Sequence, residues 1–248
     1  MSNYVIRQRY ESARRRTLVV SEIKRLTPHM LRIELEGDME DFASGAPDDH
    51  IKLFFEGSGP KPDMRDYTPR AFDVPAGRLT VDFAIHEAGP ATDWAINAKV
   101  GDTLDVGGPR GSAVINPVFD WWLLIGDETA LPAIGRRVEE SKAGTKLIVV
   151  AAIPSEDDKQ SFETEADLTC HWVTRPLEKA AEVAPMLDAL KDIKLPQGKG
   201  FIWIAAEASV AKALRDYVLT TYNHPLECLK ASGYWTKGLA DKPQKSLA

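Results

Sequence analysis

The densest group of residues able to do chemistry lies at positions 65–72, which read Arg-Asp-Tyr-Thr-Pro-Arg-Ala-Phe. The ring of Tyr67 can stack on a planar heterocycle. Thr68 can hydrogen-bond through its hydroxyl or its backbone N–H, and Arg65 and Arg70 can form forked contacts with a pyrophosphate. These residue types indicate binding of an anionic, aromatic ligand. An exposed strand with ordinary charged residues is the competing interpretation.

Two further segments of the first half contain glycine and proline, and the first of them has features of a phosphate site. The alternating run at 82–86 places Asp82, Ala84 and His86 on one strand face and leads into Gly89-Pro90-Ala91-Thr92-Asp93-Trp94. A helix beginning near Ala91 would aim its N–H groups at a phosphate. The segment at 107–112, Gly-Gly-Pro-Arg-Gly-Ser, is typical of a turn between two strands. It does not have the GxGxxG spacing of a dinucleotide fingerprint.

The second half has its candidate residues where strands end. Gly126-Asp127-Glu128-Thr129-Ala130 follows a continuous apolar run and precedes a helical pattern, which is the usual location for nucleotide phosphate or nicotinamide. A plain helix N-cap is the alternative. Glu207 ends another apolar run. Near the C-terminus, Tyr234 and Trp235 form an aromatic pair that can cover a ring ligand or pack in the core.

The elements that would position these residues differ between the two halves. Residues 18–23, 31–35, 51–55 and 79–86 alternate apolar and polar side chains, which predicts half-buried antiparallel strands of a barrel or sandwich. Beyond residue 120, strands at 121–125, 146–153, 168–174 and 201–206 alternate with helices near 130–143, 177–191 and 209–222. This order predicts a parallel sheet covered by helices. The boundary between the halves is expected near Asn116-Pro117.

In their order and spacing, these segments resemble the siderophore-interacting protein family of the ferredoxin-reductase superfamily. The resemblance implies an N-terminal antiparallel FAD-binding β-barrel over residues 1–116 and a C-terminal NAD(P)H-binding α/β domain with a parallel sheet over residues 117–248. It implies an FAD-dependent ferric-siderophore reductase. The cofactor-binding residues that it implies are Arg65, Tyr67, Thr68, Pro69, Arg70, Asp82, Ala84, His86, Gly89, Ala91, Thr92, Trp94, Gly108, Ser112, Asp127, Thr129, Ala130, Glu207, Tyr234 and Trp235.

The implied reaction is an electron transfer, so it depends on charged groups around the cofactor and the substrate more than on acid–base groups. Siderophores hold Fe(III) with hard oxygen donors, and reduction to Fe(II) weakens that preference. A flavin accepts hydride from NADPH or NADH and passes single electrons to iron, so no nucleophile or general base is required. Many ferric siderophores are anionic, so we expect a local basic pocket. Its candidate residues are Lys52, Arg110 and Lys237, each of which can also be a surface charge without a role.

Composition and residue spacing argue against several other classes of protein. A net charge of −6 argues against general nucleic-acid binding, and no apolar stretch is long enough to predict a transmembrane helix. Two cysteines favour a reducing cytoplasm over a disulfide framework. The histidines lack metal-ligand spacing, so no protein-bound metal is expected. The arginines at 7, 9, 14, 15 and 16 are interpreted as a solvated arm, and a monomer is the default expectation.

Two alternatives to this function stay open. The chain can be a flavodoxin or ferredoxin reductase-type electron-transfer flavoprotein, or a non-enzymatic siderophore-binding module. The electron donor is also open between NADH, NADPH and ferredoxin. Arg136, Arg137 and Lys212 are candidate partners for a 2′-phosphate, although exposed helix cations are commonplace.

Overall fold

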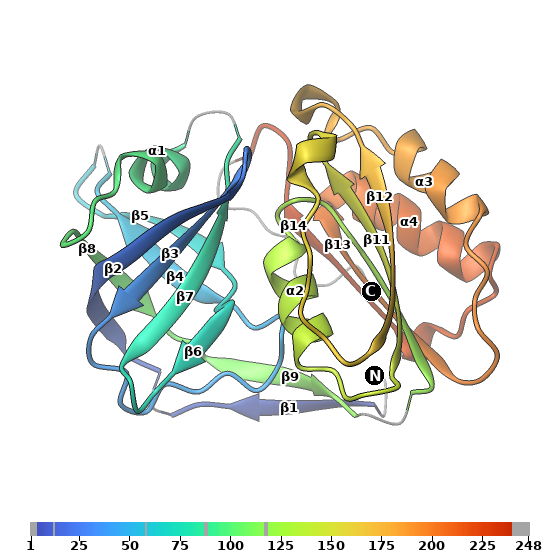
Figure 1. The fold of residues 1–248 in the computed structure, drawn as a ribbon, viewed down its shortest axis with the longest axis horizontal. Coiled ribbons are helices and arrows are strands. Elements are labelled where there is room, and N and C mark those ends of the chain that lie inside the picture. Colours follow the sequence, from blue (N-terminus) through green and yellow to red (C-terminus); the bar gives the residue numbers. More distant parts are fainter. Residues whose placement is uncertain (1–3, 12, 58, 87–88, 117–118, 240–248) are drawn as a thin grey trace. The chain divides into compact units, whose positions relative to one another are not determined.

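The computed structural model describes residues 4–11, 13–57, 59–86, 89–116 and 119–239 (Figure 1). The chain divides into two compact units. We call Ile6–Val114 the β unit, and Met1–Val5 together with Ile115–Ala248 the α/β unit. The grouping of the first five residues with the distant second half has no counterpart in the sequence pattern.

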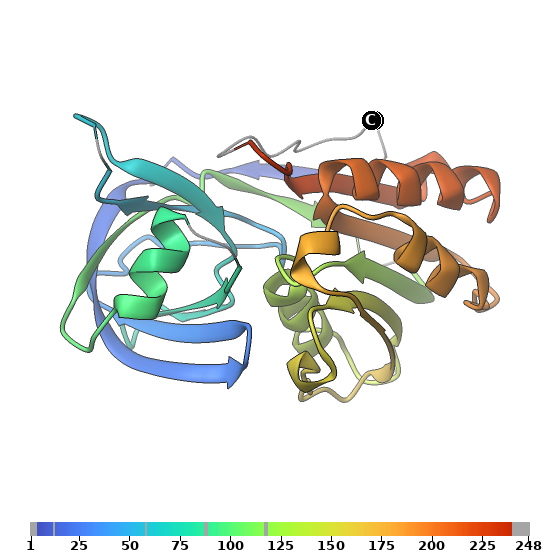
Figure 2. The same ribbon diagram turned by 90° about the horizontal axis from the view of Figure 1, so that it is seen from above.

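The β unit is built on one antiparallel sheet of seven strands in the order β5-β4-β8-β2-β3-β7-β6. The sheet is strongly curled, and β5 and β6 form its two edges (Figure 2). Alternating side chains such as Leu18, Ile33 and Phe83 fill its interior, and the helix α1 (Pro90–Asn97) contacts β3, β4 and β7. The prediction of an antiparallel barrel is confirmed in the form of a half-open barrel. Its strands are β2 (Arg15–Thr27), β3 (Met30–Glu36), β4 (Ile51–Phe55), β5 (Asp63–Tyr67), β6 (Ala71–Asp73), β7 (Arg78–Ala84) and β8 (Thr103–Gly107).

The N-terminal arginines are mostly solvated as predicted, since Arg7, Arg9, Arg14 and Arg15 are exposed, but the segment that carries them is not a free arm. The segment forms β1 (Val5–Arg9), which pairs with β9 (Gly111–Ile115), and the start of β2. Arg15 donates to Asp105 at 2.9 Å and lies over the ring of Phe54. Arg16 is only 5% exposed and donates to the Gly108 carbonyl at 3.1 Å. Acceptors on neighbouring segments therefore hold these cations in place, which the local charge pattern does not reveal.

The α/β unit contains a parallel sheet of five strands in the order β12-β11-β10-β13-β14. Helices α3 and α4 cover one face and α2 covers the other (Figure 1). The predicted parallel sheet is therefore confirmed. Its strands are β10 (Trp121–Gly126), β11 (Lys146–Ile153), β12 (Asp167–Thr174), β13 (Gly200–Glu207) and β14 (Leu229–Trp235). The helices are α2 (Leu131–Glu139), α3 (Ala184–Lys191) and α4 (Ala208–Thr220), with short 3-10 turns at Glu156–Asp158, Leu177–Lys179 and Leu226–Cys228.

Two predicted elements of this unit differ from the structure. The single helix expected over 177–191 is divided into a 3-10 turn and α3, because Pro185 lacks the N–H that a helix interior needs and occupies the first turn of α3. The edge strand β12 alternates half-buried and exposed residues, whereas β10 and β13 are buried throughout. Within the described residues, no helix combines the length and the apolar character needed to cross a bilayer.

Candidate functional site

In the β unit, the predicted flavin segment occupies the edge strand β5 and the turn after it. Lys52 on β4 stands opposite Asp66, and Ile51 stands opposite Tyr67. The Tyr67 ring packs against Phe83 of the core with their centroids 4.6 Å apart. Thr68 and Arg70 follow the strand, and both are 7% exposed. The tyrosine is therefore held by the core, and it fixes the start of the Thr68–Arg70 turn.

Asp82 organises the arginines beside this turn. Its carboxylate is 2% exposed and accepts two hydrogen bonds from Arg32, at 2.7 and 2.8 Å. The Nε atom of Arg70 lies 3.5 Å from the same carboxylate, and the Arg70 backbone N–H donates to Thr80. Two arginines therefore share one aspartate. Asp82 was predicted to bind the cofactor, and its carboxylate contacts these two arginines in the structure.

The second predicted segment leads into α1, which begins at Pro90 after the extended residue Gly89. This confirms the expected helix start, and no side chain caps the first turn. Ala91 and Thr92 are buried. Trp94 packs against Phe55 and Phe83, so its ring belongs to the core. Ala84 ends β7 and is nearly buried, and His86 is exposed just beyond it.

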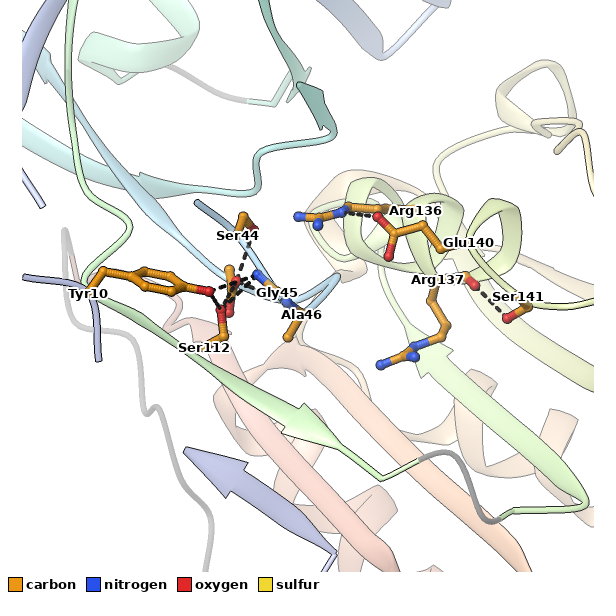
Figure 3. Close-up of polar contacts among 10 residues, drawn as sticks. Tyr10, Ser44, Gly45, Ala46, Ser112, Arg136, Arg137, Glu140 and Ser141 are labelled. Atoms are coloured by element: carbon orange, nitrogen blue, oxygen red, sulfur yellow. Dashed lines mark hydrogen bonds and ion pairs between the residues drawn. The ribbon is translucent and has the colours of Figure 1, made fainter. Parts of the chain in front are cut away.

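Ser112 belongs to a buried hydrogen-bond network (Figure 3). Its hydroxyl contacts the Tyr10 hydroxyl at 2.6 Å, donates to Asp49 at 2.5 Å and accepts from the Gly45 N–H at 2.8 Å. One donor and two lone pairs are all that a hydroxyl has. The Ser112 side chain is therefore saturated by protein groups and holds the 44–49 loop. Burial raises the pKa of Asp49, although hydrogen bonds from Ser112, Ala46 and Ser44 oppose this shift.

The predicted substrate cations fall in different surroundings. Lys52 is paired with Asp66 at 2.9 Å, and about a third of its side chain is exposed. Arg110 is exposed in the turn after Gly108, whose positive φ of 85° favours glycine. Lys237 belongs to the α/β unit, where its Nζ donates to the Glu178 carbonyl at 3.1 Å. Lys52 and Arg110 therefore belong to one unit and Lys237 to the other.

In the α/β unit, the predicted residues gather at the carboxyl ends of the strands. Asp127 follows β10, Glu207 ends β13 and Trp235 ends β14. The strand order reverses between β10 and β13, and in open parallel sheets ligands bind beside such a switch point. Asp127 accepts from the Glu207 N–H and from Trp235 Nε1, both at 2.9 Å. The structure thus brings together three predicted residues from distant parts of the chain.

Thr129 and Glu207 complete this arrangement. Thr129 donates to Asp127 from its N–H at 3.0 Å and from its hydroxyl at 2.6 Å. The alternative that Thr129 caps α2 is wrong, because Ala130 precedes the helix and no side chain caps it. Glu207 caps α4 by accepting from the N–H groups of Ser209 and Val210. Burial alone would raise the pKa of Glu207, but hydrogen bonds from Ser209, Lys237 and Val210 outweigh it, so the pKa is lowered.

Glu128 and Arg175 form a buried ion pair that the sequence reasoning missed. Arg175 follows β12 and donates from Nη2 to Glu128 at 2.8 Å, and both side chains are 4% exposed. The Nη1 atom of Arg175 is buried without a hydrogen-bond partner. Burial and the neighbouring Asp127 raise the pKa of Glu128 to about 7, against the pull of Arg175. The available signal was a charged residue within two positions of the end of each of two strands, Glu128 after β10 and Arg175 after β12.

The other cations considered for a 2′-phosphate have protein partners (Figure 3). Arg136 is 4% exposed and pairs with Glu140 at 2.6 Å. Arg137 lies over the Trp122 ring, 4.5 Å from its centroid. Lys212 pairs with Asp216 on the exposed side of α4. None of these three contacts involves a residue at the strand ends.

A curled antiparallel sheet followed by a parallel α/β unit defines the ferredoxin-reductase-like fold. The fold is shared with the ferredoxin-NADP+ reductase from Plasmodium falciparum, at a TM-score of 0.63 and 12% identity over 82% of this chain and 89% of that one. A model described as the siderophore-interacting FAD-binding domain matches residues 19–60 and 56–113. A model described as siderophore-interacting protein matches residues 119–238.

Individual relatives agree with these matches. The chain is 34% identical over 242 residues to the NADPH-dependent ferric-chelate reductase of Escherichia coli (strain K12), which covers 89% of this chain and 92% of that protein. It also superimposes on a siderophore utilization protein from T. fusca with a TM-score of 0.89 and 30% identity, covering 97% of this chain and 99% of that one. The chain belongs to the siderophore-interacting protein family.

Proposed function

We propose that the protein is an FAD-dependent reductase that takes electrons from NADPH or NADH and passes them to Fe(III) held by a siderophore. The observation that carries the proposal is that both units match siderophore-interacting models along almost their full length. We assign FAD binding to the domain at residues 1–116 and NAD(P)H binding to the domain at 117–248. The proposed electron transfer needs no nucleophile, which agrees with a site made of arginines, aromatic rings and backbone groups.

The residues of the β unit fit FAD on structural grounds. Arg32 and Arg70 both contact Asp82 beside the predicted flavin segment, and a guanidinium can form forked contacts with a pyrophosphate. The first turn of α1 has no side-chain cap, so its N–H groups can serve an anion. When bound, FAD converts the two electrons of a hydride into single electrons for iron. In the proposal, Arg65 and Arg70 bind its phosphates or reduced ring, and Tyr67, Thr68 and Pro69 orient the ring.

The carboxyl edge of the α/β unit fits the nucleotide. Thr129 and Ala130 lead into α2, whose first turn no side chain caps, and Tyr234 and Trp235 present aromatic rings at the end of β14. We propose that these residues bind NADPH or NADH. The ferric chelate is assigned to the part of the β unit that carries Lys52 and Arg110, because an anionic chelate needs a local cation on a chain with net negative charge.

The location and the assembly state are further parts of the proposal. Both cysteines are free, Cys228 buried and Cys170 partly buried, which suits a reducing cytoplasm. We propose a cytoplasmic monomer. Light scattering of the flavin-loaded protein tests the monomer, and cell fractionation tests the location.

The proposal is tested by reducing the FAD-loaded protein anaerobically with NADPH or NADH and then adding a ferric siderophore with a ferrous trap. We expect the flavin band to bleach and then return as the ferrous complex forms. Bleaching without reoxidation by ferric siderophore, but with electron transfer to a flavodoxin, would favour an electron-transfer reductase. No bleaching by either nucleotide would refute the NAD(P)H-dependent reductase and favour a ferredoxin donor or a binding module.

A pair of variants tests the arginine assignment. Arg70→Ala removes a buried cation next to Asp82, and it should lower the affinity for FAD about tenfold or more. Arg78→Ala is the matched control, because Arg78 is half-exposed on the same hairpin and its ion pair with Asp73 is long, at 3.7 Å. Equal loss of FAD in both variants would refute a specific role for Arg70.

A further inference from the structure

The acceptor sites of the Asp127 carboxylate are occupied by protein donors. One carboxylate oxygen accepts from the Thr129 N–H and hydroxyl. The other accepts from the Glu207 N–H and from Trp235 Nε1. A carboxylate has about four lone-pair sites, and four protein donors fill them. Asp127 is also 2% exposed, so its contribution to the site is made through the groups that it holds.

Of the four groups that donate to Asp127, the Trp235 indole is the one that can form part of a ligand site. Trp235 is partly exposed at the carboxyl end of β14, where a planar ring can form one wall of a ligand site. Pairing between β13 and β14 shifts at this point: Ala206 stands opposite Gly233, but Glu207 stands opposite Trp235. The extra residue in β14 is Tyr234. Bulges of this kind re-aim side chains beside functional sites, and here the bulge places Trp235 opposite Glu207, whose N–H shares its Asp127 acceptor oxygen with the indole.

A second carboxylate holds the residues that follow Trp235. The Glu207 Oε1 atom accepts from the Lys237 N–H at 3.2 Å, while Oε2 caps α4. The Lys237 ammonium donates to the Glu178 carbonyl. The segment from Trp235 to Lys237 is therefore attached at three points, two at the strand ends and one on the 3-10 turn Leu177–Lys179. Two of these attachments end on acidic side chains that follow β10 or end β13.

We propose that Asp127 is a positioning residue that fixes the Trp235 indole as a wall of the nucleotide site, with Glu207 as a second anchor for the same segment. The inference rests on the proposed function, because it assigns the NAD(P)H ring to the carboxyl edge of this unit. It changes the assigned role of both acids. They organise the site and do not contact the phosphates, which carry the same sign of charge.

The anchor itself is tested without nucleotide by the indole N–H signals of the ¹⁵N-labelled, FAD-loaded protein. The chain has 6 tryptophans, and Trp235→Phe identifies the Trp235 signal by removing it. We expect Asp127→Ala to move that signal upfield, because the hydrogen bond to a carboxylate is lost. Asp120→Ala is the matched control, since Asp120 accepts from the Lys199 N–H beside the opposite end of β10. An unmoved Trp235 signal in Asp127→Ala would overturn the inference.

The consequence for the nucleotide is tested by titrating the same variants with NADP+ and by the steady-state KM for NADPH. Asp127→Ala and Trp235→Phe should each weaken binding about tenfold, the effect of one charge-assisted hydrogen bond, with FAD content unchanged. The double variant should be no weaker than either single variant, since both break the same contact. A hundredfold loss in the double variant would contradict a shared role. Trp235→Phe leaves Asp127 in place, so it keeps the test valid if Asp127→Ala does not fold.

Failure of the proposed function gives a different pattern from failure of this inference. If neither nucleotide reduces the wild-type flavin and NADP+ does not bind, the proposed reductase fails while the indole signal still responds to Asp127→Ala. If the wild type is reduced normally and Asp127→Ala changes neither the indole signal nor the affinity for NADP+, only the positioning role fails.

Discussion

Arg175→Met should destabilise the α/β unit at alkaline pH and leave it nearly unaffected at acidic pH. Arg175 supplies the hydrogen-bonded countercharge to Glu128, at 2.8 Å in surroundings where both side chains are 4% exposed. Removing one partner of a buried ion pair leaves an uncompensated charge, which typically costs about 3–5 kcal/mol. That cost applies only while Glu128 is ionised. A neutral Glu128 needs no countercharge, so the penalty depends on pH.

The magnitude follows from the pKa of Glu128, which burial and Asp127 raise from 4.5 to about 7 despite Arg175. At pH values between 4.5 and about 7, Glu128 is protonated in the folded protein and ionised in the unfolded chain. The contribution of Glu128 to stability is therefore greatest below pH 4.5 and falls as the pH rises toward 7. Each pKa unit corresponds to about 1.4 kcal/mol, so the total is about 3 kcal/mol in the wild type. Without Arg175 the pKa rises further and the loss extends to higher pH.

Denaturant unfolding of the FAD-loaded protein measures this effect. Every tryptophan except Trp94 lies in the α/β unit, so indole fluorescence reports on that unit and flavin fluorescence on the other. We expect the difference in unfolding free energy between wild type and Arg175→Met to grow from under about 1 kcal/mol near pH 5 to about 3–5 kcal/mol near pH 8. In a Glu128→Gln background, the loss of unfolding free energy caused by Arg175→Met should no longer increase with pH. The double variant should be more stable near pH 8 than Arg175→Met alone. A penalty independent of pH, or unaffected by Glu128→Gln, would refute the coupling.

Three further predictions concern other parts of the molecule. A Cβ on Gly126 would lie 2.6 Å from a neighbouring side-chain carbon. We therefore expect Gly126→Ala to destabilise the protein by about 1–3 kcal/mol, measured by thermal unfolding. Gly59→Ala is the control and should be neutral, because a Cβ there meets nothing within 4 Å. Ser112→Ala leaves buried partners unsatisfied and should cost about 1–3 kcal/mol, read from the flavin fluorescence during denaturation. Lys52→Ala should raise the KM for an anionic ferric siderophore, and Asp66→Asn should lower it. Both changes in KM should be smaller at high salt. A change of KM in the same direction in the two variants would contradict the substrate role of Lys52.

The sequence by itself determined the two kinds of sheet and the location of the candidate segments. Alternating residues predicted β3, β4 and β7, because a strand with one buried face repeats every two residues. Continuous apolar runs predicted β10, β11 and β13, which are buried on both faces. Edge strands carry weaker patterns. The charged edge strand β5 and the bulged β14 therefore had no predicted strand boundaries, although both carry predicted site residues.

Only the tertiary structure decided which groups the candidate residues contact. Asp127 and Trp235 are 108 positions apart, and Glu128 and Arg175 are 47 apart, so their contacts depend on the order of strands in the sheet. Asp82, Asp127 and Glu207 were all predicted to touch a cofactor, and in the structure each accepts hydrogen bonds or ion pairs from protein donors. A motif identifies which residue types gather at a site. The number of protein donors around each acceptor, which decides whether a ligand can use it, is set by segments that meet only after folding.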